Sequence, residues 1–278
     1  MNRLILIALL CGICLTGVAA AQGPWVIASG ASADSRPAFL LPVSVTDNFA
    51  DHATLSVPAT LPRMAPELAL QAYQHRWESQ SAELVSYSAN ALIRAELPDS
   101  QQQGELKLER HYAAPRTLEF KAVQFTGDGF VKSNVITRLL QSEVDHVQKD
   151  DVSLTALTLA NYKFSFKGTS QLEGRTVHDY QVKPRKKRAG MFKGHVYLDA
   201  YTGSLVRAEG SVVKSPSFFI KKIEFVQDYA DVGTFTLPTH IHSEALARII
   251  GRAIVDIYQY DYQPASNTVQ ASQQIPSM

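Results

Sequence analysis

Apolar and polar residues alternate with a period of two along most of the chain, which is the pattern of half-buried β-strands. Leu106, Leu108 and Tyr112 lie between charged or polar neighbours, and the segment 118–122 repeats the pattern after a turn near residues 113–116. The two segments therefore predict a pair of adjacent strands with one buried face.

Seven more strands are predicted in the second half of the chain. Short segments such as Thr202–Gly203 and Asp231–Gly233 separate them, and their composition is typical of turns. Consecutive strands with short connections form a meander rather than a parallel α/β sheet. The predicted strands cover residues 162–167, 176–182, 195–199, 205–213, 218–229, 236–245 and 252–262.

Two segments have helical spacing of their apolar residues instead. Directly after a proline, Leu68, Tyr73 and Trp77 predict a helix over residues 67–79. The second helix is predicted over residues 130–147, where the apolar side chains fall on one side and charged or amide side chains lie off it.

So wide a sheet cannot remain flat, because strand twist makes it curl. Apolar groups have to cover its concave face, and only the two amphipathic helices are available for this. The sequence therefore predicts a mainly β (α+β) domain over residues 65–264. Its curved antiparallel sheet is expected to form an open half-barrel plugged by two helices.

Other segments flank this domain. Residues 1–21 combine Arg3, an apolar run and three alanines, which is the pattern of a cleaved signal peptide. Residues 22–64 are rich in Pro, Ala and Ser and predict an irregular arm, and the Gln- and Ser-rich residues 265–278 predict a flexible tail. We therefore expect export to the periplasm.

Composition narrows the classes of function. Cys11 and Cys14 both lie in the predicted signal peptide and neither follows a small residue, so we expect neither lipid attachment nor a thiol in the exported chain. The full chain has 27 basic and 26 acidic residues, and loss of Arg3 leaves 26 of each. A balanced charge does not favour a nucleic-acid partner, and no cofactor is predicted.

Six runs of strand and turn residues carry a resemblance to a known family. The runs are Asn161–Phe164, Gly174–Val182, Phe192–Asp199, Val206–Gly210, Lys214–Phe218 and Val232–Pro238. They resemble the LolA-like family of periplasmic outer-membrane lipoprotein-sorting proteins, and with the two helices they cover most of residues 65–264. The resemblance implies an open β-barrel with a helical lid, whose lining accepts acyl chains.

The candidate ligand cavity consists of residues whose side chains are predicted to point inward from the strands or from the second helix. Ordinary core is the default interpretation of each of them, because burial of such a side chain stabilises a fold by about 1.5–3 kcal/mol, and a ligand cavity requires in addition that the interior is incompletely filled. The candidates are Val135, Leu139, Leu140, Phe164, Phe166, Tyr180, Val182, Val196, Leu198, Phe218 and Ile220.

A second candidate site is a group of basic residues between two predicted strands. It could contact anionic lipid head groups or an acidic partner, or it could be a solvated hairpin tip. This basic patch consists of Lys183, Arg185, Lys186, Lys187, Arg188 and Lys193.

Other residue groups give weaker evidence for a functional site. His240 and His242 lie on one face of a predicted strand, but no third metal ligand is identifiable. Tyr258, Tyr260 and Tyr262 are predicted to form a stripe on one face of the last strand. The sequence has no nucleophile elbow, phosphate loop, dinucleotide glycine motif or zincin helix, so an enzyme is not predicted.

Three hypotheses follow from these observations. The first is a periplasmic carrier or chaperone that binds acyl chains of a lipid or lipoprotein inside the half-barrel, without covalent chemistry. The second is an envelope sensor or interaction module of the same fold, which recognises its target and reports to a membrane-associated protein partner. The third is an exported hydrolase, because carboxylates on several strands could meet in space.

Overall fold

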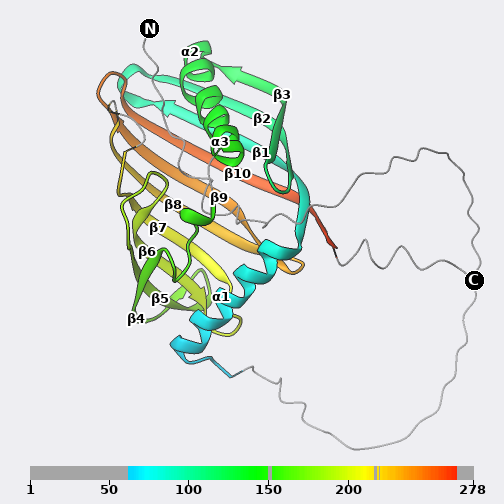
Figure 1. Ribbon diagram of the computed structural model, residues 1–278. Coiled ribbons are helices and arrows are strands. Elements are labelled where there is room, and N and C mark those ends of the chain that lie inside the picture. Colours follow the sequence, from blue (N-terminus) through cyan, green and yellow to red (C-terminus); the bar gives the residue numbers. More distant parts are fainter. Residues whose placement is uncertain (1–61, 150–151, 216–217, 219, 268–278) are drawn as a thin grey trace, which may run out of the picture. The chain divides into compact units, whose positions relative to one another are not determined.

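The computed structural model describes residues 62–149, 152–215, 218 and 220–267. Ten strands in this part of the chain form one curved antiparallel sheet, in the order β3-β2-β1-β10-β9-β8-β7-β6-β5-β4 (Figure 1). The sheet stays open, because β3 and β4 are its two edges and do not pair with each other. The mainly β half-barrel predicted from the sequence is therefore confirmed.

Ten strands and three α-helices make up the described part of the chain, with short 3₁₀ or π segments between them. The strands are β1 (Leu84–Leu97), β2 (Gln102–Ala113), β3 (Thr117–Gly127), β4 (Tyr162–Leu172), β5 (Arg175–Pro184), β6 (Phe192–Asp199), β7 (Leu205–Val212), β8 (Ile220–Val232), β9 (Phe235–Ala247) and β10 (Gly251–Ser266). The helical segments are α1 (Pro66–Glu83), η1 (Pro98–Ser100), α2 (Gly129–Val131), the π-helical η2 (Lys132–Ile136), α3 (Thr137–Lys149) and η3 (Val152–Leu154).

The predicted signal peptide lies outside the described residues, as do most of the predicted arm and tail. Within the described part, no helix is long and apolar enough to cross a bilayer.

Strand β1 is the element that sequence reasoning missed. It pairs with β10 on one side and β2 on the other, and so joins the meander β1–β3 to the meander β4–β10. Its buried positions alternate as expected for a strand, but three of them are Ala89, Ala91 and Ala95. Alanine has low β propensity, so the alternation in this segment lacks the large apolar residues that usually identify a strand.

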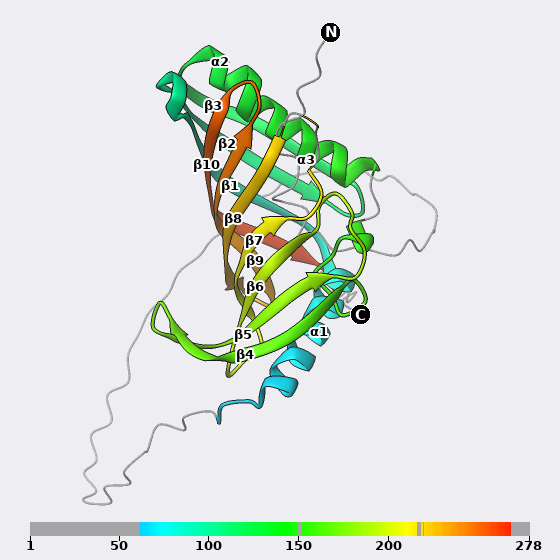
Figure 2. The ribbon, with the colours of Figure 1, turned by 90° about the vertical axis from the view of Figure 1, so that its left-hand side faces the viewer.

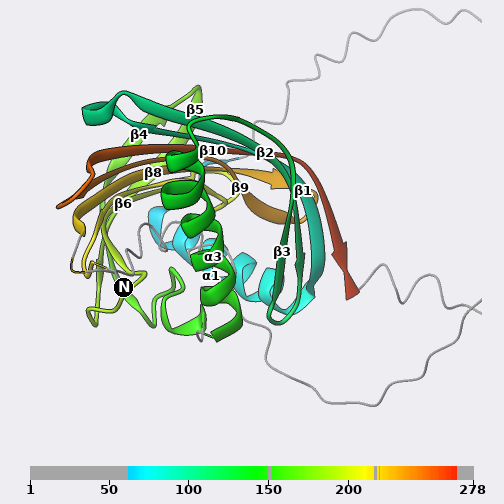
Figure 3. The ribbon, with the colours of Figure 1, turned by 90° about the horizontal axis from the view of Figure 1, so that it is seen from above.

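The connection from β3 to β4 runs from one edge of the sheet to the other. The chain leaves β3 through α2, η2 and α3, and reaches β4 through residues 152–161. Val131, Val135, Ile136 and Leu139 are buried against the sheet. Figure 3 shows α3 inside the arch of the sheet, so this connection covers the concave face.

Helix α1 packs where the β6–β7 and β8–β9 turns lie. Arg76 forms an ion pair with Asp231 at 3.2 Å, and Gln80 donates to the carbonyl of Thr234. A Cβ at Gly203 would lie 2.7 Å from the Cβ of Ala72, so this turn requires glycine. Figure 2 shows α1 well separated from α2.

The predicted apolar face of α1 is wrong at Leu68. Its side chain is exposed, whereas Ala69 and Tyr73 are buried. The helix approaches the β6–β7 turn closely, so small side chains face the sheet there.

The concave face carries one continuous apolar core. Every strand except β3 contributes at least one buried residue to it, and β3 adds the half-buried Phe120 and Phe125. Tyr73 of α1 and Leu157 of the 152–161 loop are buried in the same core. Helices and loop together therefore exclude water from a surface that the sheet alone leaves open.

Gly194 allows close contact between β6 and β7. It pairs directly with Gly210, and a Cβ at position 194 would lie 1.9 Å from the carbonyl oxygen of Glu209. We expect Gly194→Ala to lower the free energy of unfolding by about 1–3 kcal/mol, because the two strands would have to separate. Urea denaturation followed by circular dichroism measures this change.

Gly168→Ala is the matched control. Gly168 also lies in a strand, but a Cβ there would meet nothing within 4 Å. Its free energy of unfolding should change by less than about 0.5 kcal/mol. Equal destabilisation by the two substitutions would contradict this account.

Candidate functional site

The structure brings most of the predicted cavity residues together on the concave face. Seven of them are at most 3% exposed and belong to the continuous core, and Leu140 and Phe164 pack against it while half-buried. The seven are Val135, Leu139, Tyr180, Val182, Val196, Leu198 and Ile220. This apolar interior is the first candidate site.

Phe166 and Phe218 do not lie in that interior. Phe166 is 45% exposed on the edge strand β4, where its ring contacts those of His178 and Tyr180 at 5.7 Å. Phe218 is 77% exposed, because it precedes β8 in a loop instead of lying in the strand predicted from residue 218.

A buried ion pair attaches α3 to the sheet. Arg110 Nη1 lies 2.6 Å from Glu143 Oε2, and both side chains are buried. Arg110 Nε also donates to the hydroxyl of Tyr87 at 2.9 Å, and the guanidinium carbon lies 5.3 Å from the ring centroid of Phe120. The alternation of the strand could have identified this residue, because Arg110 takes an inward position between Leu108 and Tyr112.

Loss of one partner of this pair should destabilise the fold strongly. Arg110→Met or Glu143→Leu leaves a buried charge without its counter-ion, so we expect the free energy of unfolding to fall by about 3–5 kcal/mol. The double variant should recover at least half of this loss, because it buries no unpaired charge. Chemical denaturation of all three variants measures the coupling.

The exposed pair Lys121–Glu109 provides the control. Its two atoms are 3.0 Å apart, but both side chains are largely in solvent. Lys121→Met should cost less than about 1 kcal/mol. If the buried and the exposed pair respond alike, Arg110 does not attach α3 as described.

Hydrogen bonds to the sheet and loop attach α1. Tyr180 donates from its hydroxyl to the carbonyl of Pro66 at 2.5 Å, and His178 Nε2 donates to the carbonyl of Met64 at 3.0 Å. The hydroxyl of Tyr73 donates to the carbonyl of Leu157 at 2.7 Å. Burial, with a smaller contribution from the nearby Glu67 charge, raises the pKa of Tyr180 to about 12.

This raised pKa predicts a loss of stability at alkaline pH. An unfolded tyrosine releases its proton near pH 10, whereas Tyr180 in the folded protein keeps it until about pH 12. The folded state therefore holds more protons in this range, and stability falls as pH rises from about 10 to 12. In Tyr180→Phe the fall should be shallower, as measured by urea denaturation at several pH values. Parallel losses in wild type and variant would argue against this role.

The basic patch lies where β5 and β6 are joined. Lys183 lies in β5, Lys193 lies in β6, and the other four residues lie in the loop between them. None of the six forms an ion pair with a carboxylate in the described part of the chain. Their charges therefore have no carboxylate partner among the described residues.

A recess of about 200 Å³ opens beside the basic patch. Arg185 Nε donates to the carbonyl of Leu159 at 3.0 Å, and Arg188 Nη1 donates to that of Leu154 at 3.3 Å. Sequence reasoning did not include this 152–161 loop in the site. The recess is lined by Leu154, Ala160, Asn161, Arg185, Lys186, Arg188 and Met191, the last of which also belongs to the apolar core.

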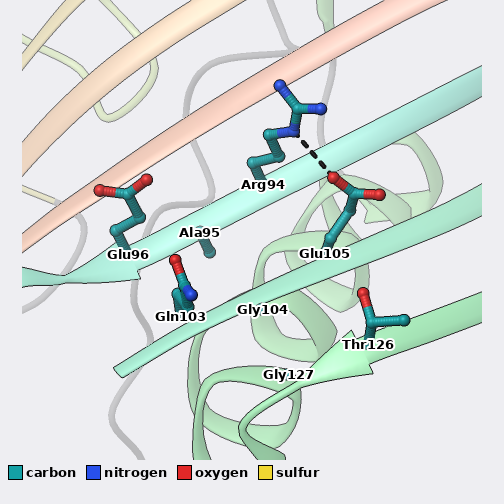
Figure 4. A pocket seen from close by; sticks show the side chains of 8 residues that line it. All are labelled: Arg94, Ala95, Glu96, Gln103, Gly104, Glu105, Thr126 and Gly127. Carbon is teal, nitrogen blue, oxygen red and sulfur yellow. Dashed lines mark hydrogen bonds and ion pairs between the residues drawn. The ribbon is translucent and has the colours of Figure 1, made fainter. Parts of the chain in front are cut away.

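A larger pocket of about 580 Å³ lies on the outer face of the sheet (Figure 4). Arg94 Nε lies 2.8 Å from Glu105 Oε2, and this hydrogen bond raises the pKa of Arg94. The other lining residues are Ala95, Glu96, Gln103, Gly104, Thr126 and Gly127. Its lining includes two carboxylates, Glu96 and Glu105, and the hydroxyl of Thr126.

The two histidines of β9 share one carboxylate. His240 Nε2 and His242 Nδ1 lie 3.1 Å and 2.9 Å from Asp256 Oδ1. Sequence reasoning missed Asp256, which pairs with His242 across β9 and β10. No group of three or more His, Cys, Asp or Glu residues suited to a metal ion occurs among the residues that the structure describes.

The predicted tyrosine stripe is wrong at its last member. Tyr258 and Tyr260 are exposed, and Tyr258 stacks on His240 with ring centroids 4.5 Å apart. Tyr262 instead packs against the buried Tyr87, with centroids 5.5 Å apart. The register of β10 shifts near Asp261, whose φ is +55°, and this shift breaks the alternation.

Comparison with known proteins gives one family match. Residues 108–263 match the family model described as "Family of unknown function (DUF5686)". The comparison with curated proteins finds no match.

Solved structures with a similar fold include three bacterial proteins. A DUF1329 family protein from Desulfovibrio piger is 10% identical, with a TM-score of 0.39 over 71% of this chain and 92% of that chain. An outer-membrane lipoprotein-sorting protein domain from Vibrio parahaemolyticus is 12% identical, with a TM-score of 0.38 over 71% and 92%. A LolA superfamily protein from Nitrosomonas europaea is 11% identical, with a TM-score of 0.36 over 70% and 92%. Two of these three proteins are described as a lipoprotein-sorting protein domain and a LolA superfamily protein.

Proposed function

The chain belongs to the DUF5686 family, whose function is unknown, and we propose that it is an exported carrier for acyl chains of a lipid or lipoprotein. The chains would lie between the concave face of the sheet and the segments that cover it. No covalent chemistry is required, because burial of hydrocarbon contributes about 25 cal/mol per Å².

One observation supports this proposal above the others. The apolar concave face extends over the whole width of an unclosed sheet, and of the residues that the structure describes only α1, the α2–α3 connection and the 152–161 loop cover it. In a closed sandwich a second sheet would fill this space permanently. Here a single helix displacement would expose a continuous apolar surface to a ligand.

Helix α3 is the segment best suited to move. Its buried polar attachment to β2 is the Arg110–Glu143 pair, and Arg116 Nη1 also donates to the carbonyl of Gln148 at 3.4 Å. The apolar contacts of Leu139 and Leu140 with the core are ones that an acyl chain could replace. Lid movements of this kind admit ligands and then exclude water from them.

Lipid bound to the purified protein tests the proposal. The protein is purified from its own envelope without detergent, and native mass spectrometry and lipid extraction determine what remains bound. We expect bound acyl lipid in the wild type and at least a tenfold loss in Leu139→Glu, because a carboxylate would face hydrocarbon. Leu246→Glu, on the exposed side of β9, should retain the lipid.

Leu139 is fully buried, so a second variant separates function from folding. Leu140→Glu changes a half-buried neighbour on the same helix and should reduce bound lipid while the far-ultraviolet circular dichroism remains native. A wild-type protein without lipid, or folded variants of Leu139 and Leu140 that keep it, would rule out the carrier.

The second candidate is an envelope interaction module, and the open edges of the sheet favour it. Strands β3 and β4 each pair on one side only within the described residues, so each presents a row of backbone groups to which another chain could add a strand. The same mass spectra distinguish the two functions. A stoichiometric protein partner without lipid would support this module.

A further inference from the structure

We propose that the end of the half-barrel formed by the β5–β6, β7–β8 and β9–β10 loops docks on a membrane surface rich in anionic phospholipids. This inference goes beyond the carrier function, because it concerns where the protein binds and not what it holds. It rests on the charges and the exposed apolar side chains of these three loops.

Contacts between the three loops place them at one end of the sheet. Val213 donates from its backbone to the carbonyl of Met191, which joins the β7–β8 loop to the β5–β6 loop. Arg248 Nε donates to the carbonyl of Phe218 at 3.1 Å, which joins the β9–β10 loop to the β7–β8 loop. Helix α1 lies at the β6–β7 and β8–β9 turns, which an antiparallel meander places at the other end.

Cations are concentrated at this end. Lys214 and Arg248 are exposed at the same end of the sheet as the six residues of the basic patch. Lys163 directly faces Lys183 across β4 and β5, and Lys193 adjoins Gly194, which pairs with Val182. Like charges opposite each other destabilise a sheet, so packing does not account for this row of lysines, whereas an anionic surface would.

Two large apolar side chains are exposed at the same end. Phe218 is 77% exposed on the β7–β8 loop, and Ile249 is 58% exposed on the β9–β10 loop. The guanidinium carbon of Arg248 lies 4.6 Å from the ring centroid of Phe218. Apolar side chains beside cations are typical of surfaces that insert shallowly into the interface of a bilayer.

This combination favours a membrane over an acidic protein as the partner. An acidic protein would need the cations alone, whereas a bilayer also provides a site for Phe218 and Ile249. Among the described residues, the recess lined by Arg185, Lys186 and Arg188 contains no carboxylate to repel an anionic head group. Each cation near an anionic membrane increases binding about fivefold at low ionic strength.

Vesicle sedimentation with the full chain tests the docking surface. We expect binding to vesicles of phosphatidylcholine mixed with phosphatidylglycerol, little binding to pure phosphatidylcholine, and weaker binding as salt rises. Lys186→Glu/Lys187→Glu should weaken binding at least tenfold. Phe218→Ser/Ile249→Ser should weaken it at least threefold and leave its salt dependence unchanged.

Matched controls lie elsewhere on the same sheet. Val123 is 62% exposed on β3 and Lys107 is exposed on β2, so Val123→Ser and Lys107→Glu should bind vesicles as the wild type does. Equal binding to neutral and anionic vesicles would overturn the proposal, as would equal losses in control and loop variants. Binding to polyglutamate but not to vesicles would overturn it in favour of an acidic protein.

The experiments can contradict the docking surface and the carrier function independently. The loop variants are also examined for bound lipid by native mass spectrometry, and they should retain it while losing vesicle binding. A protein that contains no lipid but binds anionic vesicles through these loops would contradict the carrier function and support the docking surface. Bound lipid with no vesicle binding would support the carrier function and contradict the docking surface.

Discussion

Water has to be kept from the concave face of a sheet that does not close on itself. The edge strands β3 and β4 do not pair, so the sheet does not close around the buried side chains of the interior. Three of the described segments do so instead, and polar contacts fasten each of them. Arg110–Glu143 attaches α3, and the hydroxyls of Tyr180 and Tyr73 attach α1 and the 152–161 loop. In the proposed carrier, the strength of these contacts would determine how readily the interior opens.

Cations have two different roles in this fold. Arg110 is buried, so its charge requires Glu143 and Tyr87 and serves to position a helix. The cations of the basic patch remain in water, where their charges act on whatever approaches that end of the sheet. The first role positions α3 on the sheet, and the second is the one on which the proposed docking surface depends.

The sequence predicted the sheet and both main helices because period-two and helical patterns repeat over many residues. The prediction was wrong where residues depart from these patterns. Alanines at inward positions concealed β1, the positive φ of Asp261 turned Tyr262 to the other face, and Phe218 lies in a loop. The Arg110–Glu143 pair and the recess depend on residues far apart in the chain, so no local pattern identifies them.

The connection from β3 to β4 is attached to both edges of a curved sheet, like a chord across an arc. The connection cannot move away from the sheet unless the sheet opens wider or the residues that join the connection to β3 and β4 rearrange. Occupancy of the interior would therefore be mechanically coupled to the distance between the two edge strands. A partner that adds a strand to either edge would sense whether the interior is filled, without contacting its contents.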